Sequence, residues 1–121
     1  MPIRKVLIVD DSKTELVHLG GILRNAGFEV DTAQDADEAQ NKLGQSKPDL
    51  VLMDVVMPGT NGFQLTRAIT RDPRYADVSI ILCTSKDQET DRVWGMRQGA
   101  RDYIVKPVRP EDLLSKIQAL G

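Results

Sequence analysis

The sequence has few of the residues on which disulfide, zinc and membrane proteins depend. Its 121 residues include one cysteine, one histidine and one tryptophan, and aromatic residues make up 4%. One cysteine cannot form an internal disulfide, and one cysteine with one histidine cannot complete a structural zinc site. No apolar run approaches the roughly 20 residues that span a bilayer, and no signal-peptide core is present. A net charge of −2 gives no general attraction to nucleic acid. We therefore expect a small cytoplasmic protein without nucleic-acid binding or membrane insertion.

Short apolar runs alternate with segments of helical periodicity along the whole chain. Residues 6–9, 50–53 and 80–83 are continuously apolar, which is typical of central parallel strands buried on both faces. We predict strands near residues 4–10, 28–32, 49–54, 78–84 and 102–105, each followed by a helix. Five such units with right-handed crossovers form an α/β fold, a doubly wound parallel sheet with helices on both faces. The length favours a single domain over residues 1–121.

Capping residues mark the expected helix ends. Ser12 and Glu15 have the spacing of a capping box, in which each side chain bonds the backbone N–H of the other residue. Gly27 stands where a helix-terminating glycine belongs, and Pro110 suits a first helical turn. A fourth helix is expected to follow Thr84-Ser85, with Trp94 about seven residues into it.

Polar side chains follow four of the apolar runs at the point where each run ends. The first run ends in Asp10-Asp11, the third in Asp54, the fourth in Thr84-Ser85 and the fifth in Lys106-Pro107. Ligands of such sheets bind outside the carboxyl ends of the strands, which share one edge. We therefore expect three carboxylates, a hydroxyl and an ammonium to converge there.

This combination favours phosphoryl chemistry. Crowded carboxylates repel one another by several kcal/mol at short range, so either their pKa values rise or a cation lies between them. Oxygen ligands that leave room for water suit Mg²⁺. Lys106 and Thr84 could contact phosphate oxygens, which makes Asp54 a plausible phosphoryl acceptor. Each residue alone has an ordinary explanation as a turn, a cap or a surface charge, and only their convergence predicts a site.

Residues 6–12, 54–62, 84–85 and 103–107 together resemble the response regulator receiver domain, the CheY-like family, over the whole chain. The resemblance implies a flavodoxin-like (βα)5 fold with strand order 2-1-3-4-5. It also implies a stand-alone receiver without an output domain, which we expect to be a monomer.

The resemblance assigns a role to each residue of the expected site. Asp54 would be the phosphoacceptor, and Mg²⁺ would be held by Asp10, Asp11, Asp54 and the backbone carbonyl of Val56. Lys106 would contact the phosphoryl group.

Two further residues of the resemblance concern switching. Thr84 would be the switch hydroxyl, which moves toward the phosphoryl group, and Tyr103 the switch aromatic, which turns inward behind it. The Lys106–Pro107 peptide bond would be cis, which only an X-Pro bond allows at low energy.

The partners also follow from the resemblance. A histidine kinase would donate the phosphoryl group from a phosphohistidine, and an unknown output protein would bind the face of the fourth helix, fifth strand and fifth helix. The chain would alternatively act as a phosphate sink. It would be no enzyme beyond promoting its own phosphorylation and dephosphorylation. Residues 84–103 with 61–64 further resemble stand-alone receivers of chemotaxis-like systems that control type IV pili and twitching motility.

The alternative is a metal-dependent phosphatase of the haloacid dehalogenase type, which also forms an aspartyl-phosphate. Those enzymes use an Asp-x-Asp in which the second Asp is a general acid, whereas Val56 occupies that position here. No residues remain for their substrate-recognising cap. The signalling function is therefore the favoured hypothesis.

Overall fold

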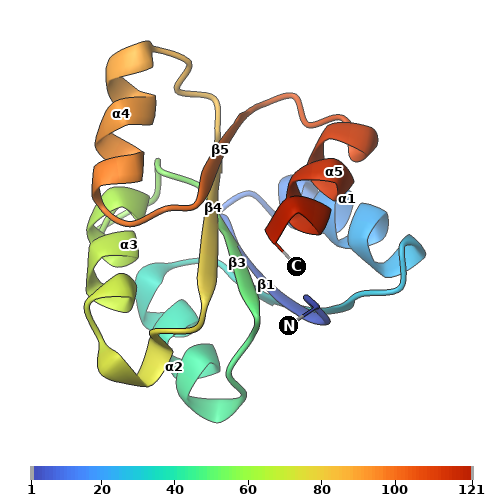
Figure 1. Cartoon of the computed structure of the whole chain (residues 1–121), viewed down its shortest axis with the longest axis horizontal. Helices are drawn as coiled ribbons and strands as arrows, with labels where there is room; N and C mark the ends of the chain where they lie inside the picture. Colours follow the sequence, from blue (N-terminus) through green and yellow to red (C-terminus); the bar gives the residue numbers. More distant parts are fainter. Residues whose placement is uncertain (1, 121) are drawn as a thin grey trace.

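Strands and helices alternate along the chain in the computed structural model, which describes residues 2–120 (Figure 1). The strands are β1 (Lys5–Val9), β2 (Glu29–Ala33), β3 (Leu50–Met53), β4 (Ser79–Thr84) and β5 (Asp102–Val105). The helices are α1 (Lys13–Asn25), α2 (Ala36–Gln45), α3 (Gly62–Thr70), α4 (Glu89–Arg97) and α5 (Pro110–Leu120), with a 3-10 helix η1 (Pro73–Tyr75). The predicted α/β alternation is confirmed, although η1 was not predicted. Among residues 2–120, no helix combines the length and apolarity needed to cross a membrane.

The five strands form one parallel sheet in the order β2-β1-β3-β4-β5, as expected. Its register pairs Val9 of β1 with Met53 of β3. Asp10 and Asp54 are the next residues along these two strands, and the backbone N–H of Asp54 donates to the carbonyl of Val9 at 2.9 Å. The register therefore brings the two aspartates to neighbouring positions at one edge.

Side chains of β1, β3, β4 and β5 alternate between two apolar layers. Val6 and Ile8 of β1 pack in the layer that includes α1 and α5, whereas Leu7 and Val9 pack in the layer that includes α2 and α3. Figure 1 shows α1 and α5 on one side of the sheet and α2, α3 and α4 on the other. This two-sided burial explains the continuous apolar runs of β1, β3 and β4.

The expected capping box of α1 forms only in part. Ser12 is the N-cap, and its hydroxyl accepts a hydrogen bond from the backbone N–H of Glu15 at 3.3 Å. The backbone N–H of Ser12, however, donates to Oδ1 of Asp10 at 2.9 Å rather than to Glu15. The buried carboxylate takes the donor that the box would have used.

Two other helix ends match the sequence pattern, and so does the place of α4. Gly27 follows α1 with a φ of 95°, a conformation that glycine adopts freely, and Pro110 is the first residue of α5. The fourth helix, α4, follows Thr84-Ser85 as expected. Gln88 and Asp91 form the capping box at its start, so the helix begins at Glu89.

Candidate functional site

Three carboxylates converge at the carboxyl edge of the sheet. Asp10, Asp11 and Asp54 each offer an oxygen within 4.8 Å of the others. The side chains of Asp10 and Asp54 are only 3% and 11% exposed, whereas Asp11 is exposed. Two of the three carboxylates are therefore removed from most of the solvent that would otherwise screen their repulsion.

Lys106 reaches this acidic group from the end of β5. Its Nζ lies 2.7 Å from Oδ2 of Asp10 and 3.3 Å from Oδ2 of Asp54. The backbone N–H of Lys106 donates to the carbonyl of Thr84 at 2.9 Å, which continues the β4–β5 pairing past the end of β5. Sheet pairing thus directs the ammonium group to the aspartates.

One ammonium faces three carboxylates at this site, so the group carries a net negative charge. Burial raises the pKa of Asp10, and the hydrogen bonds from Lys106 and the Ser12 N–H offset this only in part. Burial by itself would lower the pKa of Lys106, but its hydrogen bond to Asp10 and the neighbouring carboxylates raise it overall. A divalent cation would supply the missing positive charge. Three carboxylates without sulfur or nitrogen donors are a ligand set that fits Mg²⁺.

The two expected switch residues are connected through the backbone of Lys86. Thr84 is fully buried, and its Oγ1 accepts a hydrogen bond from the Lys86 N–H at 3.4 Å. Tyr103 is also buried, and its hydroxyl donates to the Lys86 carbonyl at 2.8 Å. Burial raises the pKa of Tyr103 to about 12. The ring therefore already occupies the inward position that we expected only after phosphorylation.

The Lys106–Pro107 peptide bond is cis in the structure, as the resemblance implied.

Val56 points its side chain outward, and its backbone N–H donates to Oδ1 of Asp54 at 3.3 Å. The use of the Val56 carbonyl as a metal ligand stays a prediction.

Sequence reasoning missed two residues next to the site. Oε2 of Glu15 lies 3.7 Å from Nζ of Lys106, although the capping pattern assigned Glu15 to the helix end. Gly62 has no space for a side chain, because a Cβ there would lie 2.1 Å from the carbonyl oxygen of Asp54. No sequence signal indicated either contact, since both depend on how distant segments pack.

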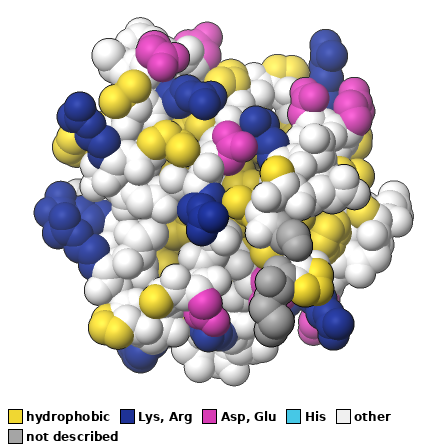
Figure 2. Space-filling model, viewed as in Figure 1, with side chains coloured by type: hydrophobic (Ala, Val, Ile, Leu, Met, Phe, Trp, Pro, Cys, Tyr) yellow, Lys and Arg dark blue, Asp and Glu magenta, His cyan; other side chains and the backbone are white. Residues whose placement is uncertain are grey.

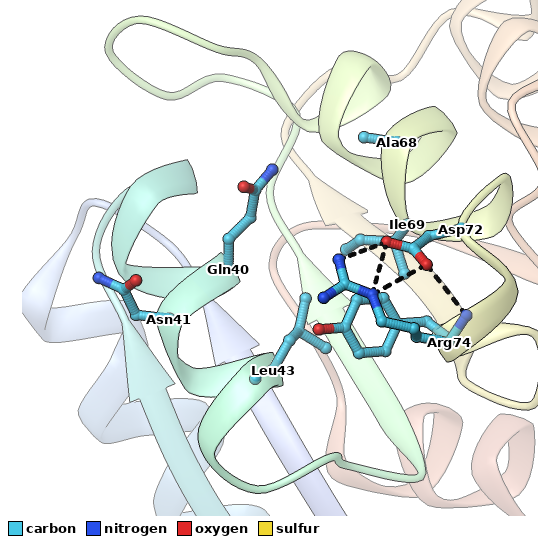
Figure 3. A pocket seen from close by; sticks show the side chains of 9 residues that line it. Gln40, Asn41, Leu43, Ala68, Ile69, Asp72 and Arg74 are labelled. Carbon is cyan, nitrogen blue, oxygen red and sulfur yellow. Dashed lines mark hydrogen bonds and ion pairs between the residues drawn. The ribbon is translucent and has the colours of Figure 1, made fainter.

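Two hollows differ in their relation to the acidic group. One of about 610 Å³ opens beside Asp11, between the loops that follow β1, β2 and β3. The other, of about 280 Å³, lies between α2, α3 and η1 (Figure 3). Figure 3 shows its Arg74 paired with Asp72, with 2.7 Å between Nη2 and Oδ2. Residues of the acidic group do not line this second hollow.

Comparisons with known proteins agree with this geometry. The family of the response regulator receiver domain matches residues 6–118. The chain is 51% identical to PilH of Pseudomonas aeruginosa over 96% of each chain. It is 35% identical to PhoB of Escherichia coli and spans about half (51%) of that protein. The structure of the chemotaxis response regulator CheY4 of Vibrio cholerae superimposes with a TM-score of 0.90 at 34% identity, covering 98% of this chain and 99% of that one.

Proposed function

Because the chain belongs to the response regulator receiver domain family, we propose that Asp54 accepts a phosphoryl group from a phosphohistidine of a histidine kinase. The bond from phosphorus to the imidazole nitrogen breaks as a bond to an Asp54 oxygen forms, and the electron pair stays with the imidazole. The observation that carries this proposal is the convergence of the acidic group with Lys106. Phosphoryl transfer depends mainly on such positioning and charge neutralisation.

Asp10, Asp11 and Asp54, with the Val56 carbonyl, are the residues that would hold Mg²⁺. When bound, the ion would neutralise charge on the phosphoryl oxygens. Lys106 supplies a positive charge 3.3 Å from Oδ2 of Asp54. The protein promotes its own phosphorylation and dephosphorylation and catalyses no other reaction.

The output of phosphorylation is the binding of a partner protein to the face of α4, β5 and α5. The alternative is that the chain acts as a phosphate sink. Exposed apolar side chains support this surface: Val93, Trp94 and Met96 of α4 and Val105 of β5. Figure 2 shows hydrophobic side chains interspersed with charged ones over this part of the molecule. The backbone of Lys86, which bonds both Thr84 and Tyr103, connects the end of β4 with this face.

Similarity to PilH supports a role in a chemotaxis-like system that controls type IV pili and twitching motility. The chain should restore wild-type twitching to a P. aeruginosa strain lacking PilH, whereas its Asp54→Asn variant should not. If both the unmodified chain and Asp54→Asn restore twitching, the role in twitching does not depend on phosphorylation of Asp54. If neither restores it, the result counts against the role in twitching.

The acceptor is tested by labelling with acetyl phosphate and Mg²⁺, followed by intact mass. The wild type should gain one phosphoryl group, and Asp54→Asn should gain none because it lacks the nucleophile. Asp77→Asn is the matched control, since Asp77 is an exposed carboxylate paired with Lys47. Undiminished labelling of Asp54→Asn would exclude Asp54 as the acceptor. Steady hydrolysis of a generic phosphomonoester would favour the phosphatase alternative instead.

Trp94 can report whether the site communicates with the output face. It is 49% exposed and is the only tryptophan of the chain. Mg²⁺ alone should change its fluorescence little, and beryllofluoride, a phosphoryl mimic, should change it clearly. Thr84→Ala should reduce that change while Asp54 is still labelled. A full response to Mg²⁺ alone would contradict this coupling.

A further inference from the structure

Glu15 faces the site from the first turn of α1. Among residues 2–120, three carboxylates lie within ion-pair distance of Lys106, and Glu15 is the one outside the acidic group of Asp10, Asp11 and Asp54. Its Oε2 lies 3.7 Å from Nζ of Lys106. That is longer than the roughly 2.7–2.9 Å of a charge-assisted hydrogen bond.

The side chain of Glu15 is available because the capping box of α1 is incomplete. In a complete box the Glu15 carboxylate would accept the backbone N–H of Ser12. That N–H instead donates to Oδ1 of Asp10. The Ser12 hydroxyl still holds the backbone N–H of Glu15, so the residue stays fixed at the start of the helix.

The Glu15 carboxylate also has an unused acceptor. Oε2 is buried and has no hydrogen-bond partner within the described residues. A buried acceptor without a donor is energetically unfavourable. The ammonium of Lys106 is the cation within ion-pair reach, and a shift of about 1 Å would complete a hydrogen bond between the two groups.

We infer that Glu15 is a positioning residue for Lys106, an inference that rests on the proposed function. In that function Asp10 and Asp54, the two nearer partners of Lys106, also serve as metal ligands, and Asp54 becomes phosphorylated. Neither then offers Lys106 the full attraction of a free carboxylate. Glu15 keeps its charge and holds the ammonium beside the acceptor throughout the reaction.

The test compares Glu15→Gln with wild type in the rate of labelling by acetyl phosphate at fixed Mg²⁺. The maximal rate should fall about three- to fivefold, in line with the loss of one ion pair, while KM for acetyl phosphate is unchanged or lower. If Glu15 acted only by repelling the anionic donor, Glu15→Gln would lower KM and leave the maximal rate unchanged, so an unchanged maximal rate would overturn the inference. Glu15→Asp, which keeps the charge on a shorter side chain, should recover part of the rate.

A second readout observes the lysine directly. The ¹⁵N signal of a lysine ammonium is sharp only while a partner slows its proton exchange, and Lys106→Gln assigns the signal by removing it. Without Mg²⁺ the signal should be present in wild type and Glu15→Gln, because Asp10 holds the ammonium at 2.7 Å. With Mg²⁺ it should persist in wild type and broaden in Glu15→Gln. Equal signals in the two proteins with Mg²⁺ bound would overturn the inference.

Two controls separate this inference from the others. Glu111→Gln removes an exposed carboxylate from the first turn of α5 and should leave rate and signal unchanged. In a Lys106→Gln background, Glu15→Gln should have no further effect on the rate, because the two residues act as a pair. An additive effect would mean that Glu15 acts independently of Lys106. If wild type is not labelled at all, the proposed function fails, whereas normal labelling of Glu15→Gln defeats only the role of Glu15.

Discussion

Gly62→Ala should lower both the free energy of unfolding and the rate of phosphorylation, because Gly62 lies against the backbone of Asp54. An added Cβ would lie 2.1 Å from the carbonyl oxygen of Asp54 and 2.8 Å from Cα of Val55. Both are backbone atoms, so no side-chain rotation relieves the overlap and the backbone must move by about 1 Å. Overpacking of this kind costs about 3 kcal/mol, a large fraction of the ~5–15 kcal/mol by which small domains are stable.

The same displacement moves the acceptor. Misplacing a reacting group by about 1 Å lowers rates by roughly a hundredfold, so labelling of Asp54 by acetyl phosphate should slow to that extent. Urea unfolding followed by circular dichroism measures the stability, and intact mass measures the labelling. Gly21→Ala in α1 is the matched control. A Cβ at Gly21 meets no atom within 4 Å, and this helical substitution should stabilise the protein by about 0.5–1 kcal/mol. Wild-type stability and labelling in Gly62→Ala would refute the reasoning.

Two further predictions concern charge. Asp11→Asn should stabilise the metal-free protein slightly, by less than about 1 kcal/mol, because its exposed carboxylate adds to the repulsion within the acidic group. It should also reduce the stabilisation that Mg²⁺ adds. Relative to wild type, the urea midpoint of unfolding should therefore rise in EDTA and fall in Mg²⁺. A loss of stability in EDTA would contradict the argument. The free energy of unfolding should fall between pH 9 and 12. Burial raises the pKa of Cys83 from 9.0 to about 12 and the pKa of Tyr103 from 10.0 to about 12. The folded state therefore holds protons in this range that the unfolded state releases. Cys83→Ala should flatten the lower part of that decline, and an unchanged slope would show that the thiol does not contribute.

The fold and the edge that carries the site could be predicted because they depend on local pattern and on a general rule of topology. Continuous apolar runs located β1, β3 and β4, and the rule that ligands bind at the carboxyl ends of parallel strands located the acidic group. The register then places Asp10 beside Asp54 without any specific side-chain interaction. Residues that directly follow a strand were therefore the predictable part of the site.

Contacts that depend on packing between distant segments could not be predicted. The sequence marks Gly62 only as part of a loop, whereas its role follows from the position of the Asp54 carbonyl. Tyr103 is identified as a switch residue by resemblance, but its inward position depends on the carbonyl of Lys86, 17 residues away along the chain.

Glu15 illustrates how a local rule yields to a buried charge. The backbone N–H of Ser12 has two possible acceptors, the Glu15 carboxylate of a capping box and Oδ1 of Asp10. The side chain of Asp10 is 3% exposed and that of Glu15 is 26% exposed as a whole, so Asp10 gains more from the donor. The N–H therefore bonds Asp10, and Glu15 is left facing Lys106. Crowding of acidic residues at the sheet edge thus determines a side-chain direction one helical turn away, and the cost of burying Asp10 places a further carboxylate beside the lysine.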